Sequence, residues 1–139
     1  MGVVVTGWGT LMSGGSQPRV LHQVGLTLLS PAACSSPPSL YMEDMVTERM
    51  VCAAGPGKDS CQVGTILTSF ITTGGVQGDS GGPLVTPAPS GRYVLVGVVS
   101  WGLGCAREDA PGVYARVTTE LAWIREMVGE GDLCSPTDM

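Results

Sequence analysis

The sequence is poor in the residues on which nucleic-acid-binding and metal-binding proteins depend. It holds one histidine and seven Lys and Arg residues against twelve Asp and Glu, which gives a formal net charge of −5. No cluster of basic residues interrupts this acidic balance, which argues against binding to nucleic acid or to an anionic membrane surface. No apolar run approaches the roughly 20 residues that cross a bilayer, so we predict no transmembrane segment.

The cysteines lack the CxxC spacing of a typical zinc site. There are five, namely Cys34, Cys52, Cys61, Cys105 and Cys134. Because a single histidine accompanies them, disulfides are favoured over a metal site, and disulfides imply an oxidising compartment and hence secretion. The first residues do not have the basic and long apolar regions of a secretion signal. We therefore expect that the chain is a fragment of a longer protein.

The composition favours one all-β domain. At 139 residues the chain is long enough for a single core, and 21 Gly, 10 Pro and only 14% charged residues suit short strands joined by tight turns. Apolar and β-branched stretches predict six strands, at residues 3–9, 20–29, 50–54, 82–86, 93–101 and 112–117. The sequence therefore predicts a small antiparallel barrel.

Two stretches indicate helix. Ser30 followed by Pro31 is typical of the start of a short helical turn. Residues 119–128 have apolar side chains at helical spacing, and Thr118 or Thr119 is the predicted N-cap. Residues 35–49 are interpreted as a surface excursion.

The hexapeptide GDSGGP, residues 78–83, places a serine in a turn flanked by glycines. With no side chains nearby, the amides of Gly78 and Ser80 can point at one spot and stabilise a tetrahedral oxyanion, for about 3 kcal/mol per donor. The alternative interpretation is a glycine-rich hairpin turn with an incidental serine. A simple turn does not need Asp, Ser and two Gly in this order, so the pattern favours Ser80 as a nucleophile.

Further motifs follow one order along the chain. They are GWGT at 7–10, CAAG at 52–55, KDSCQ at 58–62, GDSGGPL at 78–84, VSWGLGC at 99–105, PGVYARV at 111–117 and AWI at 122–124. On these motifs the sequence resembles the C-terminal half of a trypsin-like serine protease of the chymotrypsin family. The resemblance implies the second six-stranded Greek-key barrel of a double-barrel fold, with a C-terminal helix. It makes residues 1–128 a partial protease domain and 129–139 a tail.

The resemblance also implies roles for individual residues. Ser80 is the nucleophile, Gly78 contributes to the oxyanion hole, and Asp79 supports that hole by pairing with the amino terminus freed on activation. Asp59 lies at the bottom of the specificity pocket, where a buried carboxylate favours Arg or Lys of a substrate. Without its neighbours, Asp59 would be interpreted as a solvated turn residue. The other substrate-binding positions are Ser100, Trp101, Gly102, Gly104 and Gly112, and no cofactor or metal is implied.

Ser100 to Gly102 match the segment that pairs with substrate backbone as an added strand. Gly102 and Gly112 match glycines that keep the pocket open. Trp101 matches a pocket wall, although core packing is the usual place of such a tryptophan.

The cysteine pairing also comes from the resemblance. It joins Cys34 to Cys52 and Cys61 to Cys105, and it leaves Cys134 for a missing segment or another chain. A third bridge of the family has no counterpart, because Val3 and Thr86 stand at its two positions.

The resemblance places the catalytic His and Asp on a first barrel that this sequence lacks. The one histidine, His22, lies on the second predicted strand and is interpreted as an ordinary strand residue. Without a base, Ser80 should turn over slower by on the order of a million-fold, so we expect the chain alone to be nearly inactive.

Residues 63–77 interrupt the family pattern, in which the glutamine at Gln62 runs directly into GDSGG. The segment carries no charge and is rich in Thr and Ile. Two accounts stay open. It is a regulatory or inactivating loop, or it is translated intron, because a Val codon begins with GT and a Gln codon can end in AG.

Three functional hypotheses follow. The first is a trypsin-like serine endopeptidase, secreted when intact, that cleaves peptide or protein substrates after Arg or Lys. The second is a non-catalytic, protease-like binding module. The third is a truncated or intron-retaining product without stable function.

Overall fold

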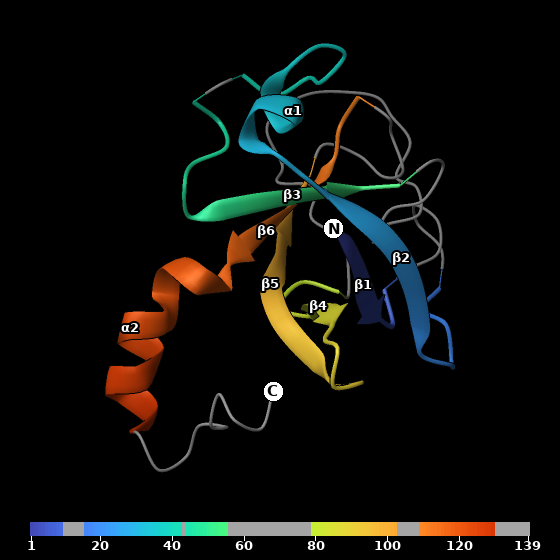
Figure 1. The fold of residues 1–139 in the computed structure, drawn as a ribbon. Coiled ribbons are helices and arrows are strands. Elements are labelled where there is room, and N and C mark those ends of the chain that lie inside the picture. The colour runs from blue at the N-terminus through green and yellow to red at the C-terminus, as the bar shows by residue number, and fades with distance from the viewer. Residues whose placement is uncertain (10–15, 43, 56–78, 103–108, 130–139) are drawn as a thin grey trace.

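The structure is a computed structural model of the chain, and it describes residues 1–9, 16–42, 44–55, 79–102 and 109–129. These residues form β1 (Gly2–Gly7), β2 (His22–Leu29), α1 (Pro31–Ser35), β3 (Met50–Ala54), β4 (Pro83–Pro87), β5 (Tyr93–Trp101), β6 (Gly112–Arg116) and α2 (Val117–Val128). The strands close into an antiparallel barrel in the order β1-β2-β3-β6-β5-β4, and α2 lies outside it (Figure 1). The predicted barrel and C-terminal helix are confirmed.

Side chains that point inward and outward alternate along the strands, and the inward ones form the interior of the barrel. On β1, Val3 and Val5 are buried, and each faces an inward residue of β2 in the register Val3↔Leu26 and Val5↔Val24. Successive side chains of a strand point to opposite faces, so the β-branched run of β1 fills the core with every second residue. The barrel core, as we call this cluster, consists of Val3, Val5, Leu26, Ala53, Leu84, Val99 and Tyr114.

Strand β5 is the longest strand and pairs with both β4 and β6. Its pairing with β6 shifts between Val99 and Trp101, so Ser100 is an extra residue with no partner on β6. Such a bulge bends a strand and changes the direction of its side chains, and bulges are frequent beside active sites.

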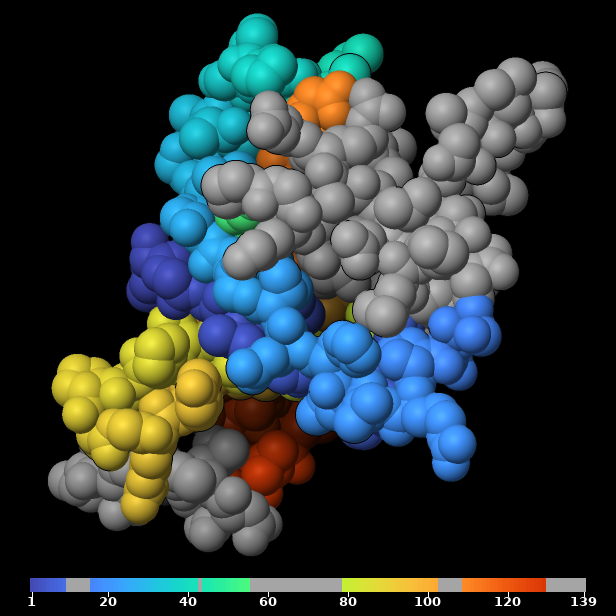
Figure 2. Space-filling view, turned by 90° about the vertical axis from the view of Figure 1, so that its right-hand side faces the viewer, coloured from blue at the N-terminus to red at the C-terminus, as the bar shows by residue number. Residues whose placement is uncertain are grey.

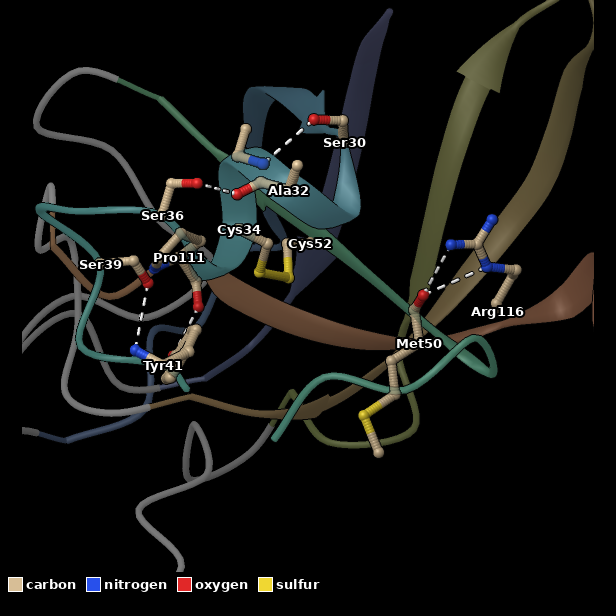
Figure 3. The surroundings of a disulfide bond; sticks show 11 residues. Ser30, Ala32, Cys34, Ser36, Ser39, Tyr41, Met50, Cys52, Pro111 and Arg116 are labelled. Carbon is tan, nitrogen blue, oxygen red and sulfur yellow. Dashed lines mark hydrogen bonds between the residues drawn. A yellow bond between two sulfur atoms is a disulfide. The ribbon is translucent and has the colours of Figure 1, made fainter. Parts of the chain in front are cut away.

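A second cluster lies beside the barrel, between α1, β3 and the loop before β6. It is called the outer cluster here and consists of Cys34, Tyr41, Cys52, Ala110 and Val113. Helix α1 begins as predicted, since the Ser30 side chain accepts a hydrogen bond from the Ala33 amide at 3.1 Å. The Cys34–Cys52 disulfide ties α1 to β3, with 6.1 Å between its Cα atoms (Figure 3). This confirms one of the two predicted bridges.

The start of α2 differs from the prediction. The N-cap is Arg116, without a side-chain capping bond, and not Thr118 or Thr119. The helix follows β6 directly, and the Arg116 guanidinium instead donates to the Met50 carbonyl through Nε at 3.1 Å and Nη2 at 2.9 Å. The Thr119 hydroxyl lies in the first turn and donates to the Arg116 carbonyl at 2.7 Å. Strand pairing therefore fixes the first helical residue, and the local capping preference does not.

The two positions of the absent third bridge lie on neighbouring strands. Val4 pairs with Val85 across β1 and β4, so Val3 and Thr86 flank this pair. Val3 points into the barrel core, and the Thr86 hydroxyl donates to the Gly2 carbonyl at 3.0 Å. A hydrogen bond thus links the two strands at these positions.

Within the described residues, no helix is both long and apolar enough to cross a membrane.

Candidate active site

The turn that carries Ser80 connects directly to β4. The Gly82 amide donates to the Asp79 carbonyl at 2.8 Å, which closes a four-residue turn over 79–82. Its third residue, Gly81, has φ +83°, a left-handed conformation that type II turns require and that glycine adopts without strain. Ser80 is therefore the second residue of the turn, at its corner, and it is exposed.

Strand β5 holds this turn in place from one side. The Gly81 amide donates to the Val99 carbonyl at 3.0 Å, and the Val99 amide donates to the Gly82 carbonyl at 2.9 Å. A side chain at Gly82 would not fit, because a Cβ there would lie 2.7 Å from the Asp79 carbonyl oxygen. Gly81 thus allows the left-handed conformation of the turn, and Gly82 allows the close approach of the Asp79 backbone.

The Asp79 side chain holds the turn from the other side. Its Oδ1 accepts a hydrogen bond from the Gly9 amide at 2.6 Å, although the two residues are 70 positions apart in the chain. A Cβ at Gly7 would overlap this carboxylate, and one at Gly9 would lie 2.5 Å from Oδ2. The carboxylate therefore occupies the space that the two glycines of GWG leave open. Asp79 is half-buried, and the described residues give it no ion-pair partner.

The predicted substrate-pairing segment begins at the bulge of β5. Ser100, the bulged residue, is exposed, whereas Trp101 is half-buried. The Trp101 ring packs edge to face against Tyr41, with ring centroids 5.2 Å apart and planes at 68°. The Tyr41 hydroxyl donates to the Pro111 carbonyl at 2.7 Å, a buried hydrogen bond seen in Figure 3. Trp101 is thus held by the outer cluster.

The structure brings Gly102 and Gly112 together. A Cβ at Gly102 would lie 3.8 Å from the Gly112 Cα and 3.7 Å from the Tyr41 hydroxyl, which are ordinary contact distances. A side chain at Gly102 would therefore fill the space beside Gly112 and Tyr41. The proposed role of these two glycines in keeping a pocket open remains a prediction.

Several predicted positions lie outside the described residues. These are Gly78, Asp59, Gly104, Cys61, Cys105, Cys134 and the segment 63–77. Of the predicted substrate-binding residues, Ser100, Trp101, Gly102 and Gly112 are described, and β5 and β6 bring them to one end of the barrel.

Sequence reasoning missed two features of this site. Tyr41 is 2% exposed and supports Trp101, although the stretch around it was interpreted as a surface excursion. The one indication in the sequence that this residue is buried was its aromatic side chain within a polar segment. Gly7 and Gly9 were noted as part of a family motif, but not as the seat of the Asp79 carboxylate. Neither contact leaves a local pattern, because its partners are far apart in the sequence.

His22 lies at the beginning of β2, directly opposite Gly7 of β1. The side chain is exposed. Figure 2 shows that the segment 16–21 and the start of β2, in bright blue, lie on the surface of this face of the molecule. Among the described residues, no three His, Cys, Asp or Glu side chains gather as a metal site would need.

Comparisons with known proteins extend over most of the chain. A family model described as Trypsin matches residues 1–124. The chain is 43% identical over 125 residues to Trypsin-1 of Astacus astacus, which covers 88% of this chain and 45% of that protein. It is 41% identical over 128 residues to the Vitellin-degrading protease of Bombyx mori, covering 90% of this chain and 40% of that protein.

A third relative is Transmembrane protease serine 9 of Rattus norvegicus. It is 40% identical over 129 residues, which cover 91% of this chain and 10% of that protein. The chain therefore spans less than half the length of each of these three relatives.

Proposed function

Because the chain belongs to the trypsin family, we propose that it is the C-terminal barrel of a serine endopeptidase, with Ser80 as the nucleophile. The observation that carries the proposal is the turn over 79–82. Asp79 fastens it to the Gly9 amide, and Gly81 fastens it to the Val99 carbonyl. Because the turn is held from both sides, the Ser80 hydroxyl at its corner has a fixed position. Nucleophilic attack on a carbonyl requires such positioning.

The residues around the turn fit a peptide substrate. The bulge at Ser100 and the supported ring of Trp101 lie on the strand that also fixes Gly81. An extended substrate could add to this strand through main-chain hydrogen bonds. In the proposed function, Gly78 donates to the oxyanion and Asp59 recognises Arg or Lys of the substrate.

We further propose that the chain alone is nearly inactive and that the complete protein is secreted. Attack by Ser80 requires a base that accepts the hydroxyl proton, and in this family that base is a histidine oriented by an aspartate. The one histidine of the chain, His22, is exposed at the start of β2, opposite Gly7 of β1. The missing base belongs to a first barrel that precedes this chain in the complete protein.

The proposal is tested by supplying that barrel. The first-barrel portion of Astacus astacus Trypsin-1 is fused before Met1, with residues 63–77 either kept or removed. We expect the fusion without 63–77 to hydrolyse an arginyl ester and to react at Ser80 with a fluorophosphonate probe. Residues 1–139 alone should do neither, and Ser80→Ala in the fusion should abolish both.

Each outcome bears on one part of the proposal. Rapid labelling of Ser80 in residues 1–139 alone would overturn the need for an external base. A folded fusion that binds substrate peptide without cleaving it would favour the binding-module hypothesis. Activity only after removal of 63–77 would make that segment inhibitory, and sequencing the transcript across its codons would separate a genuine loop from retained intron.

A further inference from the structure

The segment 16–21, SQPRVL, leads into β2 as exposed main chain. All of its residues except Pro18 are exposed, and Figure 2 shows the segment, in bright blue, on the surface of the molecule. Its main chain makes no hydrogen bond to another described residue before the β1–β2 ladder begins at His22. The segment contains Arg19, which is followed by Val20 and not by a proline. Exposed main chain of this kind is where proteases cut folded proteins, because they bind a substrate in an extended conformation.

The other four described arginines lie in hydrogen-bonded main chain. Arg116 belongs to β6 and Arg125 to α2. The carbonyls of Arg49 and Arg92 each accept a main-chain amide at 2.8 Å. A protease can bind these stretches only after local opening, because it needs the same main-chain groups. Among the described residues, Arg19–Val20 is therefore the bond after an arginine that is most open to hydrolysis.

No disulfide within residues 1–139 can retain the piece that such a cut would release. All five cysteines follow residue 19, and Cys34 is the first of them. The two positions at which the family has a bridge between β1 and β4 hold Val3 and Thr86. After a cut at Arg19–Val20, β1 is therefore attached to its neighbours β2 and β4 by strand pairing and packing alone.

Strand β1 and the residues after it support both the barrel core and the turn that carries Ser80. Val3 and Val5 belong to that core and are each 2% exposed. Gly9 donates its amide to Asp79 Oδ1 at 2.6 Å. Departure of residues 1–19 would remove two core side chains and the donor that fastens the turn. A cut also turns contacts within one chain into contacts between two molecules, which weaken on dilution.

We propose that Arg19–Val20 is a regulatory cleavage site, at which an endopeptidase that cleaves after arginine causes β1 to leave the barrel. Water is the co-reactant: the C–N bond between the two residues breaks, Arg19 gains a carboxylate and Val20 gains an amino group. Once β1 has left, the turn over 79–82 lacks its Gly9 anchor. That this loss inactivates an enzyme rests on the proposed function, but the cleavage and the departure of β1 do not.

Limited proteolysis tests where the chain is cut. Residues 1–139 with Lys58→Gln and Arg107→Gln, which leave the five described arginines as the cleavable positions, are treated with an endopeptidase that cleaves after Arg and Lys. Mass spectrometry follows each bond over time. We expect cleavage after Arg19 to be at least about ten-fold faster than after any other arginine, because the others require local opening.

Two matched variants identify the bond. Arg19→Gln should abolish the first cut, and Arg92→Gln, in the turn between β4 and β5, should leave its rate unchanged. Faster cleavage after Arg49, Arg92, Arg116 or Arg125 than after Arg19 would overturn the proposal.

Dilution tests whether β1 leaves after the cut. The chain cut at Arg19–Val20 is purified without denaturant and diluted from about 50 μM to about 0.5 μM. At the lower concentration we expect most of residues 1–19 to separate from residues 20–139 on size-exclusion chromatography, and the strand signal in circular dichroism to fall. The uncut chain should keep its signal at both concentrations. Retention of residues 1–19 at the lower concentration would overturn the proposal.

A variant with the missing bridge is the control for this step. The register Val4↔Val85 and Val5↔Leu84 continues to Val3 opposite Thr86, so Val3→Cys with Thr86→Cys can join the two strands. With this bridge formed, the cut chain should keep residues 1–19 and its strand signal on dilution. An equal loss of signal in the bridged chain would show that the cut itself opens the barrel, and would also overturn the proposal.

Neither measurement depends on catalysis by Ser80. If the fusion with a first barrel is inactive, the cleavage and dilution results on residues 1–139 still decide this proposal, and if they fail, the fusion experiment still decides the proposed function. In an active fusion, the same cut followed by dilution should abolish hydrolysis of the arginyl ester.

Discussion

The barrel and helix α2 differ in how their apolar side chains are covered. The seven residues of the barrel core are at most 6% exposed. Helix α2 has no buried residue, and its Trp123 and Met127 are 60% and 59% exposed. A closed sheet covers its own inner face, whereas an amphipathic helix needs another surface. The barrel strands thus cover their own apolar side chains, whereas the described residues leave those of α2 exposed.

The largest expected effect comes from opening a cavity in the barrel core. Leu84 is fully buried and pairs with Val5 of β1 and Gly97 of β5. We expect Leu84→Ala to lower the free energy of unfolding by about 3 kcal/mol, because the side chain loses its contacts and leaves a void. Urea denaturation at low micromolar concentration measures this. The paired control is Leu95→Ala, an exposed residue of β5, and an equal loss for both would contradict the comparison.

A smaller effect is expected in the outer cluster. Tyr41→Phe removes the hydroxyl that donates to the Pro111 carbonyl and leaves the ring on Trp101 in place. The loss of one buried hydrogen bond should cost about 1 to 2 kcal/mol of stability, since the carbonyl is left without this donor. In the same variant, the fluorescence of the tryptophans should change less than in Tyr41→Ala. Identical spectra for the two variants would argue against the ring contact.

The smallest expected effect lies on helix α2. Trp123→Ser should change the free energy of unfolding by less than about 0.5 kcal/mol, because the side chain is already exposed to water. The same change should lower self-association at high concentration, since an exposed apolar patch promotes it. Analytical ultracentrifugation of the wild type and the variant checks this. A clear loss of stability would show that α2 is packed more closely than its exposure indicates.

The three substitutions order the side chains by how extensively each one is packed against other parts of the molecule. A residue of the barrel core packs against several strands. Tyr41 packs within the outer cluster and against Trp101. Trp123 stays largely exposed among the described residues. The ranking would be sharpened by repeating the Trp123 measurement in the fusion with a first barrel. If the added barrel covers α2, Trp123→Ser should then cost about 3 kcal/mol, as for truncation of a buried aromatic residue.

The sequence alone determined the elements that depend on local patterning. Alternating β-branched and apolar residues marked all six strands to within a few residues, since a two-residue period is fixed by the pleat of a strand. Ser30 before Pro31 marked α1, and ordered motifs marked the family and the Cys34–Cys52 bridge. The glycines around Ser80 predicted a turn, but the left-handed conformation of Gly81 is known only from the structure.

Only the tertiary structure decided which distant residues meet. Asp79 reaches Gly9, and Tyr41 reaches Pro111, each across 70 positions of sequence. The helix α2 begins directly after Arg116, whose guanidinium donates to the Met50 carbonyl, and not at the predicted threonine cap. The register of β1 against β2 brought His22 opposite Gly7. The physical reason is that closure of the barrel sets these contacts, and closure depends on the packing of all six strands together.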